Sequence, residues 1–222
     1  MTGLINPLVI AFGASDVAHP NRISTMQHTI QQEIKGVVAF VAAIWAVFVL
    51  DWVLPVDLNS FGLVPRSLPG LVGIPAMPFL HANLQHIVSN TVPLFILLIL
   101  LAGCRANSWV VVIAVVALGG ALLWLFGRPA THIGASGLIF GLTAFLLVSG
   151  FFEGRVMPLL IALLVAFLYG GSLLTGIIPR LHSQISWDGH LAGALAGAIL
   201  AYLLTRNSQP RAPTIEDANS LA

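Results

Sequence analysis

The chain has 222 residues, of which 58% are hydrophobic and only 8% are charged, whereas a soluble domain carries roughly 25% charged residues. This composition excludes a soluble globular fold, and a net charge of +1 with no basic stripe excludes a nucleic-acid partner. The single cysteine, Cys104, excludes an intramolecular disulfide and a cysteine-based zinc site. The length suits one all-α bundle of about six membrane-spanning helices joined by short loops, with the lipid bilayer as its surroundings.

Residues 1–35 have a mixed composition, and we expect a cytoplasmic or interfacial lead-in there. A signal peptide does not fit, because no Lys or Arg precedes Arg22 to form a basic amino-terminal region. Residues 36–54 are apolar and predict the first span. Asp51, near the end of this span, is expected among the lipid headgroups rather than in a functional site.

Residues 55–80 form a hydrophobic segment that is too rich in Pro and Gly for a spanning helix. Its prolines are Pro55, Pro65, Pro69, Pro75 and Pro78. Irregular backbone at membrane depth is tolerated only where protein or a water-filled cavity covers it. The segment is therefore expected to lie partly in the membrane, either as the wall of an active site or as a structural interfacial loop.

His86 and Asn90 stand at the start of the second predicted span, which continues through the apolar run of residues 91–102. Residues four apart lie one turn apart on the same face of a helix. Because polar groups are costly inside a membrane, such a pair is a candidate for function. Water or neighbouring backbone can also satisfy polar groups near a helix end, so the pair alone leaves both interpretations open.

Four further spans complete a single six-helix domain over residues 36–205. They are predicted at residues 109–127, 134–152, 156–176 and 190–204. A short polar link, residues 179–188, precedes the last of them. The polar tail, residues 206–222, contains Pro210 and Pro213 and is typical of a disordered segment.

The distribution of Lys and Arg predicts the orientation of the bundle. With both termini in the cytoplasm, that side carries six of the nine basic residues, namely Arg22, Lys35, Arg105, Arg155, Arg206 and Arg211. The opposite side carries Arg66, Arg128 and Arg180. Since cytoplasmic loops are enriched in Lys and Arg, both termini are expected inside. In this topology the start of the second span, Ser136 and His190 all lie in the extracytoplasmic half of the membrane.

Two series of glycines predict close packing between the fourth and sixth spans. They are Gly137 and Gly141 in the fourth span, and Gly189, Gly193 and Gly197 in the sixth. Small residues at four-residue intervals let two helix backbones approach closely. Packing of these two faces would bring Ser136 toward His190, because each residue stands near the same end of its helix.

A serine beside an imidazole predicts nucleophilic catalysis, since the hydroxyl of Ser136 needs a base such as His190 to take its proton. Asp188 precedes His190 by two residues and points in another direction on a helix, so we expect it to be the N-cap of the sixth span. No carboxylate partner is expected for His190. Donors from His86 and Asn90, with the backbone N–H of Ser136, would stabilise an oxyanion.

These motifs together resemble those of the rhomboid intramembrane serine proteases. The segment Gly134-Ala135-Ser136-Gly137 matches the family's GxSG motif, His86 and Asn90 match its HxxxN pattern, and His190 with Gly193 matches its HxxG pattern. The resemblance covers residues 36–205, with the motifs in the family's order. It implies a six-transmembrane-helix rhomboid-like bundle in which residues 55–80 form the partly embedded first loop.

The resemblance also implies a role for each motif residue. Ser136 would be the nucleophile and His190 the general base, while His86, Asn90 and the Ser136 N–H would form the oxyanion hole. Phe140 stands where many relatives have a tyrosine that stacks on the base, and it keeps the stacking face. The helix-packing glycines would be Gly134, Gly137, Gly141, Gly193 and Gly197. No cofactor or metal is implied.

Two further features follow from the resemblance. Substrates would reach the site beside the fifth span. The first loop of the family often carries a Trp-Arg pair, whereas this chain has only Arg66 with no adjacent Trp. This departure weakens the loop assignment but not the predicted chemistry.

The remaining histidines are interpreted as structural or solvated. His132 lies two residues before the GxSG motif and is expected to be solvated at the membrane surface. His81 is expected to be structural and to hydrogen-bond the loop. The histidines of polar segments are His19, His28 and His182. A metal site built from His81, His86 and His132 would lack a carboxylate ligand and would leave Ser136 unexplained.

The sequence therefore predicts a serine endopeptidase with a Ser-His dyad that hydrolyses peptide bonds in or near the transmembrane segments of single-span or polytopic membrane proteins. It is expected to be a multi-pass protein of a bacterial plasma membrane. A non-catalytic rhomboid-like protein that binds membrane clients is the alternative, although such a protein should lack the dyad. A transporter would distribute its polar groups along a path through the bilayer, whereas here they cluster in one half. The sequence sets no oligomeric state.

Overall fold

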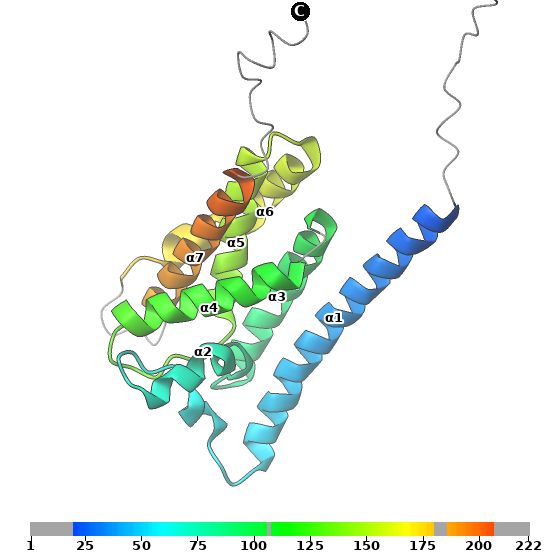
Figure 1. Ribbon diagram of the computed structural model, residues 1–222. Coiled ribbons are helices and arrows are strands. Elements are labelled where there is room, and N and C mark those ends of the chain that lie inside the picture. The colour runs from blue at the N-terminus through cyan, green and yellow to red at the C-terminus, as the bar shows by residue number, and fades with distance from the viewer. Residues whose placement is uncertain (1–19, 106–107, 180–185, 207–222) are drawn as a thin grey trace, which may run out of the picture.

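The structure, a computed structural model, describes residues 20–105, 108–179 and 186–206. Within these ranges the chain is helical, with no β-strand (Figure 1). The long helices are α1 (Pro20–Val53), α3 (Leu84–Cys104), α4 (Ser108–Phe126), α5 (Ser136–Phe152), α6 (Val156–Gly176) and α7 (Trp187–Arg206). Between α1 and α3 lie the short helix α2 (Gly73–Ala76) and the 3-10 turns η1 (Leu58–Phe61), η2 (Pro69–Val72) and η3 (Met77–Phe79).

Five helices of the described chain are long and apolar enough to cross a membrane, at Gln31–Val53, Leu84–Cys104, Ser108–Phe126, Val156–Gly176 and Trp187–Thr205. The protein is therefore an integral multi-pass membrane protein with an all-helical bundle, as the sequence predicted. α5 is apolar but has only 17 residues, which is at the short end of the roughly 17–25 residues that span a bilayer. The count of six spans stays a prediction.

The predicted helix bounds agree closely with the observed ones except at the first helix. α6 covers residues 156–176 as predicted, whereas α1 begins at Pro20 rather than at residue 36. Proline favours the first position of a helix, and no Pro or Gly interrupts the chain between Pro20 and Gly36. The polar stretch ahead of the first span therefore extends the same helix. Residues 1–19 and 207–222 lie outside the described residues, so the expected limits of both terminal segments stay predictions.

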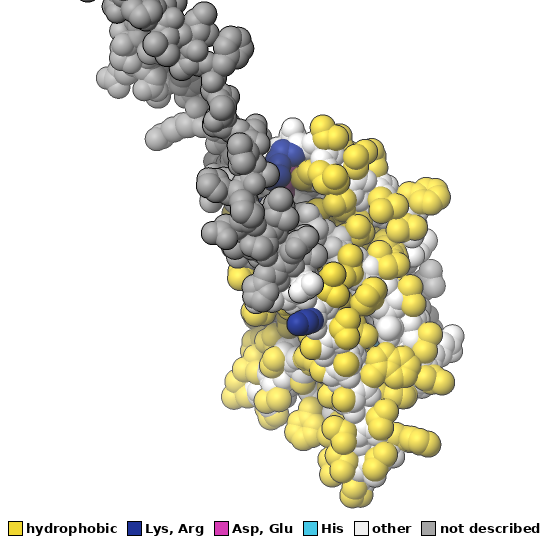
Figure 2. Space-filling view, turned by 90° about the vertical axis from the view of Figure 1, so that its right-hand side faces the viewer, with side chains coloured by type: hydrophobic (Ala, Val, Ile, Leu, Met, Phe, Trp, Pro, Cys, Tyr) yellow, Lys and Arg dark blue, Asp and Glu magenta, His cyan; other side chains and the backbone are white. Residues whose placement is uncertain are grey.

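α5 lies at the centre of the bundle, and α3, α4, α6 and α7 pack around it (Figure 1). Leu142 and Phe145 of α5 are fully buried, whereas outward-facing residues of the other elements stay exposed and apolar. Phe167 of α6 is 86% exposed, as is Trp52 of α1. Figure 2 shows hydrophobic side chains over most of the visible described face, with few charges. A surface of this kind suits lipid rather than water.

α5 and α7 pack through the two predicted glycine series. A Cβ on Gly193 would collide with the carbonyl oxygen of Gly137, and a Cβ on Gly197 would collide with that of Gly141. Only glycine therefore permits this approach of the two backbones. The close packing of the fourth and sixth predicted spans is confirmed, and it brings the first turn of α5 beside the first turn of α7.

The first loop, residues 55–80, is anchored to the end of α4. The Arg66 side chain donates to the Gly127 carbonyl at 2.8 Å, and its backbone N–H donates to the Trp124 carbonyl at 2.9 Å. The indole N–H of Trp124 donates in turn to the Ser67 carbonyl at 2.8 Å. The loop has no tryptophan beside Arg66, and Trp124 of α4 instead hydrogen-bonds to the backbone of Arg66 and Ser67.

Asp51 anchors the other end of this loop. Its carboxylate accepts hydrogen bonds from the Leu58 backbone N–H at 2.6 Å and from the Asn59 side chain at 2.7 Å. The carboxylate therefore fixes the turn that follows α1 and takes no part in a functional site, which agrees with the expectation that it lies outside one.

Candidate active site

Ser136 opens α5 directly after a tight turn at Gly134. Gly134 has φ +107°, and a Cβ there would lie 2.6 Å from Nε2 of His86. Both the backbone conformation and the neighbouring ring therefore require glycine. The Gly134 N–H donates to the Met77 carbonyl of the first loop at 2.9 Å. The loop thus holds the turn in place behind the serine.

A cavity of about 550 Å³ contains all four of the predicted catalytic and oxyanion-hole side chains. Its lining comprises Ala82, Asn83, His86, Ser89, Asn90, Thr131, His132, Ile133, Ser136, Ser186 and His190. No residue of the first loop belongs to this lining, so the loop supports the site from behind and is not its wall. Ser136 and His190 are both described, and no hydrogen bond joins their side chains; such bonds often tighten only when substrate binds.

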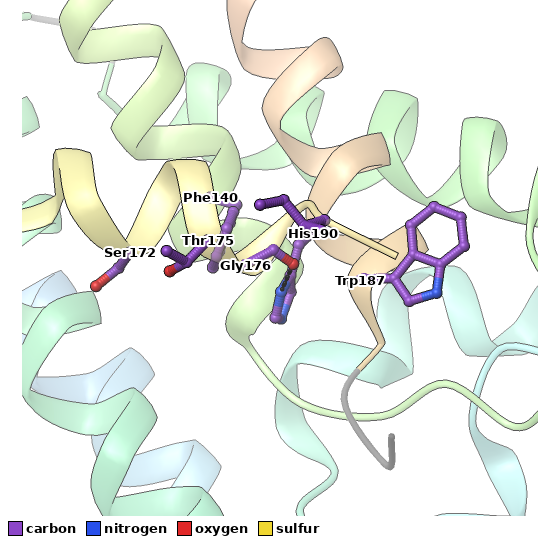
Figure 3. Close-up of a pocket in the computed structure, with 7 residues that line it drawn as sticks. Phe140, Ser172, Thr175, Gly176, Trp187 and His190 are labelled. Atoms are coloured by element: carbon purple, nitrogen blue, oxygen red, sulfur yellow. Dashed lines mark hydrogen bonds between the residues drawn. The ribbon is translucent and has the colours of Figure 1, made fainter. Parts of the chain in front are cut away.

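His190, in the first turn of α7, is held by two groups from neighbouring helices (Figure 3). Its Nδ1 lies 3.0 Å from the carbonyl oxygen of Gly176, the last residue of α6. Because a carbonyl can only accept, Nδ1 carries the hydrogen, and neutral His190 keeps a lone pair on Nε2. The Phe140 ring stacks on the imidazole with centroids 4.0 Å apart and planes 11° apart.

Asp188 does not cap α7, and that prediction is wrong. α7 begins at Trp187, so Asp188 lies inside its first turn, and the Ser186 hydroxyl accepts from the Gly189 N–H at 3.2 Å as the cap. The Asp188 carboxylate instead accepts from the Arg128 backbone N–H at 2.8 Å and pairs with its guanidinium at 3.1 Å. The ring partner of His190 is therefore a carbonyl and not this carboxylate.

His86 and Asn90 lie in the first two turns of α3, as the spacing predicted. Asn83 caps this helix, since its side chain accepts from the His86 N–H at 2.9 Å. The Asn90 amide donates to the His86 carbonyl at 2.9 Å, which leaves its second hydrogen for the cavity. The Ser136 N–H belongs to the first turn of α5, where backbone N–H groups have no partner within the helix. His86, Asn90 and Ser136 all line the same cavity.

His81 lies beside His86 and serves the structure, which confirms the prediction. Its ring is 2% exposed, and its Nδ1 contacts the Phe79 carbonyl of the loop at 3.4 Å. The rings of His81 and His86 meet edge to face at 5.0 Å. Burial, with a contribution from His86, lowers the pKa of His81 to about 4. His81 is therefore neutral near pH 7.

His132 is buried, and the prediction that it is solvated is wrong. Only 3% of the residue is exposed, since its backbone pairs with Leu63 of the loop and its ring contacts the start of α7. Nδ1 lies 2.7 Å from the Ser186 hydroxyl and Nε2 lies 3.1 Å from the Arg128 carbonyl.

The other histidine predictions fall mostly outside the described part of the chain. His19, His182 and the side chain of His28 are not among the described residues. Among the residues that are described, no group of three or more His, Cys, Asp or Glu side chains gathers as a metal ion would require.

Two smaller cavities adjoin the first. One, of about 260 Å³, is lined by residues of α3, α5 and α6, including Ser136, Asn90 and Tyr169. The other, of about 230 Å³, lies beside Phe140, His190 and Trp187 (Figure 3).

The sequence did not predict the Gly176 carbonyl as a partner of His190. A signal for this contact was present in the sequence, because Pro179 marks the end of a helix shortly before it, and the last carbonyls of a helix have no partner within the helix.

Comparison with known proteins gives a family match and several relatives. Residues 70–207 match the Rhomboid domain family. An uncharacterized protein of Mycobacterium bovis and one of Mycobacterium tuberculosis are each 43% identical over 179 residues, which are 76% of this chain and 74% of the relative. An uncharacterized protein of Mycobacterium leprae is 42% identical over 179 residues, 76% of this chain and 70% of its own.

Proposed function

We propose that this chain, which belongs to the rhomboid family, is a serine endopeptidase that hydrolyses peptide bonds in or near the transmembrane segments of other membrane proteins. Ser136 is the nucleophile and His190 the general base. The observation that carries the proposal is that both line one cavity with His86 and Asn90, while the Gly176 carbonyl leaves Nε2 of His190 as the acceptor.

Acylation begins when Nε2 of His190 takes the proton of the Ser136 hydroxyl as its oxygen attacks the substrate carbonyl carbon. The carbonyl oxygen becomes an oxyanion, which the Ser136 N–H, the second hydrogen of the Asn90 amide and the His86 ring stabilise. When the tetrahedral intermediate collapses, the C–N bond breaks and the protonated His190 gives its proton to the leaving amine.

Deacylation uses the same base with water as the nucleophile. His190 takes a proton from water, the resulting hydroxide oxygen attacks the ester carbonyl, and the proton returns to Ser136 as the acid product leaves. Water reaches the ester through the cavity, whose lining includes polar side chains of Asn83, Ser89 and Thr131. Each proton that His190 accepts is returned within the same half-reaction, so no external base is required.

The substrate is a transmembrane segment that reaches the site laterally. The smaller cavity between α3, α5 and α6 includes Ser136 and the apolar side chains of Ile139, Leu168 and Leu173. This placement supports access from lipid beside α6, which is the side that family resemblance implies. A helical peptide bond is covered and hydrogen-bonded, so the substrate must unwind locally, and family resemblance implies a small residue before the scissile bond.

The orientation follows from charge and from the ends of the helices. The start of α1 and the end of α7 lie at the same end of the bundle, opposite the first loop (Figure 1). Arg105 and Arg155 both pair with Glu153, on the side where more Lys and Arg gather. The positive-inside rule supports cytoplasmic termini in a bacterial plasma membrane, with the cavity opening on the extracytoplasmic side.

Two measurements on the reconstituted full-length protein test the proposal. A fluorescent fluorophosphonate should label the wild type, and a single-span test substrate should be cleaved. Ser136→Ala should lose both reactions, and His190→Ala should lose cleavage. Ser149→Ala is the matched control, because Ser149 stands on the same helix α5 but lines none of the three cavities, and its hydroxyl donates to the Leu146 carbonyl at 3.5 Å. Normal cleavage by Ser136→Ala would exclude this mechanism, and a folded wild type that neither labels nor cleaves would favour client binding.

A further inference from the structure

A partly buried polar network joins the segment before α5 to the start of α7. It consists of the side chains of Arg128, His132, Ser186 and Asp188, and we call it the α5–α7 latch. His132 contacts the Ser186 hydroxyl at 2.7 Å, and Asp188 pairs with the Arg128 guanidinium at 3.1 Å. His132, at 3% exposed, and Asp188, at 8%, are both buried. Polar groups at such depth are stabilising only when they are hydrogen-bonded.

The two halves of the latch stand at matching positions ahead of the two proposed catalytic residues. His132 precedes Ser136 by four residues, and Ser186 precedes His190 by four residues. The His190 N–H also donates to the Ser186 carbonyl at 3.0 Å. The contact between His132 and Ser186 therefore links the chain that leads into the nucleophile to the chain that leads into the base, in addition to the glycine packing of α5 against α7.

The first loop fixes His132 from the other side. The backbones of Leu63 and His132 exchange two hydrogen bonds, at 3.0 and 2.8 Å. His132 thus joins three segments, because its backbone is held by the loop while its ring holds α7.

The hydrogen-bond roles within the latch are mutually consistent. Nε2 of His132 donates to the Arg128 carbonyl at 3.1 Å, so in neutral His132 Nδ1 accepts from the Ser186 hydroxyl at 2.7 Å. The same hydroxyl lies 3.3 Å from Oδ1 of Asp188, which is the longer of its two contacts with an acceptor. The Ser186 oxygen accepts in turn from the Gly189 N–H at 3.2 Å. The Arg128 backbone N–H and guanidinium both reach the Asp188 carboxylate. The Ser186 hydroxyl, although it lies beside a histidine in the main cavity, is therefore engaged as a structural link.

We infer that the α5–α7 latch positions the Ser136–His190 dyad, with His132 and Ser186 as positioning residues that touch neither substrate nor reacting atoms. This inference rests on the proposed function. The side chains of Ser136 and His190 share no hydrogen bond of their own in the described structure, so their separation depends on how the first turns of α5 and α7 are held. A misplacement of about 1 Å in a catalytic site can lower the rate about 100-fold.

The test compares His132→Phe with His132→Asn in the full-length protein reconstituted in bicelles. Phe keeps the ring but loses both hydrogen bonds, whereas the Asn side-chain oxygen can accept from Ser186 as Nδ1 does. His132→Phe should label with fluorophosphonate about 10-fold or more slowly per folded molecule and show a lower kcat, with KM unchanged within about twofold. His132→Asn should recover much of the labelling rate. Equal labelling rates per folded molecule, with only a lower unfolding temperature, would overturn the inference.

A second pair of variants serves if His132→Phe does not fold. Ser186→Thr keeps the hydroxyl and should react as the wild type does, whereas Ser186→Ala loses it and should label slowly. If Ser136→Ala still labels and Ser186→Ala does not, Ser186 is itself the nucleophile and the positioning role is wrong. A folded wild type that neither labels nor cleaves defeats the proposed function, whereas a reactive wild type with equally reactive His132→Phe and Ser186→Ala defeats only the latch.

Discussion

The ring of Phe140 lies face to face with the imidazole of His190, with centroids 4.0 Å apart and planes 11° apart. Phe140 stands on α5 one turn after Ser136, so the helix that carries the proposed nucleophile also carries the surface on which the proposed base rests. The Gly176 carbonyl holds the edge of the same imidazole through Nδ1. The orientation of His190 is therefore fixed by one contact from α5 and one from α6.

Replacement of Phe140 by Leu should slow catalysis because Leu keeps an apolar side chain but loses the flat face. An aromatic stack contributes about 0.5–1.5 kcal/mol, so kcat/KM should fall about 2- to 13-fold. Phe140→Tyr keeps the face and should stay within about twofold of the wild type. Cleavage kinetics of a single-span substrate in bicelles measure both. A Phe140→Leu protein as fast as the wild type would show that the ring does not hold the base.

Replacement of Asn90 by Ala should lower kcat about 100- to 1,000-fold if its amide stabilises the oxyanion. Ser89→Ala is the matched control, because the Ser89 hydroxyl and the Asn90 amide donate to the same His86 carbonyl, each at 2.9 Å. If the amide only supported the backbone of α3, both variants would lose similar activity. We expect Ser89→Ala to keep nearly full activity, and equal losses in single-turnover cleavage would argue against the oxyanion role.

Replacement of Gly197 by Ala should destabilise the bundle away from the active site. The new Cβ would meet the Gly141 carbonyl oxygen, and overpacking of this kind costs about 1–3 kcal/mol. Gly171→Ala on α6 is the control, since a Cβ there has no neighbouring atom within 4 Å. Thermal unfolding in detergent, followed by tryptophan fluorescence, should show a lower midpoint for Gly197→Ala alone. Equal midpoints would mean that α5 and α7 can separate without loss of stability.

The sequence predicted most of the helices, and the four candidate site residues that it named line one cavity, because helices and motifs both leave local signals. Spans appear as long apolar runs, and the glycine intervals predict the α5–α7 contact. The start of α1 was missed because a polar helix beyond the membrane has no apolar run, and propensity alone does not distinguish it from a loop. Pro20, the first residue of α1, was the signal in the sequence that marks the start of this helix.

The contacts that the sequence did not predict join residues far apart in the chain. His132 meets Ser186 across 54 positions and Asp188 meets Arg128 across 60. A single sequence shows each residue as an isolated polar group near a helix end, for which solvation and capping are the ordinary interpretations. Only the packing of α7 against α5 makes these four side chains partners. Trp124 of α4 is likewise far from Arg66 in the chain, and its carbonyl accepts a hydrogen bond from the Arg66 backbone N–H.

Acid should destabilise the protein partly through His81. The pKa of this buried imidazole is about 4 in the folded chain, lowered from its ordinary 6.5 by burial. Between these two values the unfolded chain binds a proton that the folded chain does not, so stability falls as the pH decreases from about 6.5 toward 4 and then levels off. The full effect amounts to at most about 3 kcal/mol.

His81→Asn keeps a donor for the Phe79 carbonyl but does not titrate, and the other histidines are common to both proteins. The difference in unfolding free energy between wild type and His81→Asn, measured from pH 7 to pH 4, should therefore shift in favour of the variant at low pH. Parallel curves for the two proteins would show that His81 takes up its proton equally in the folded and unfolded states.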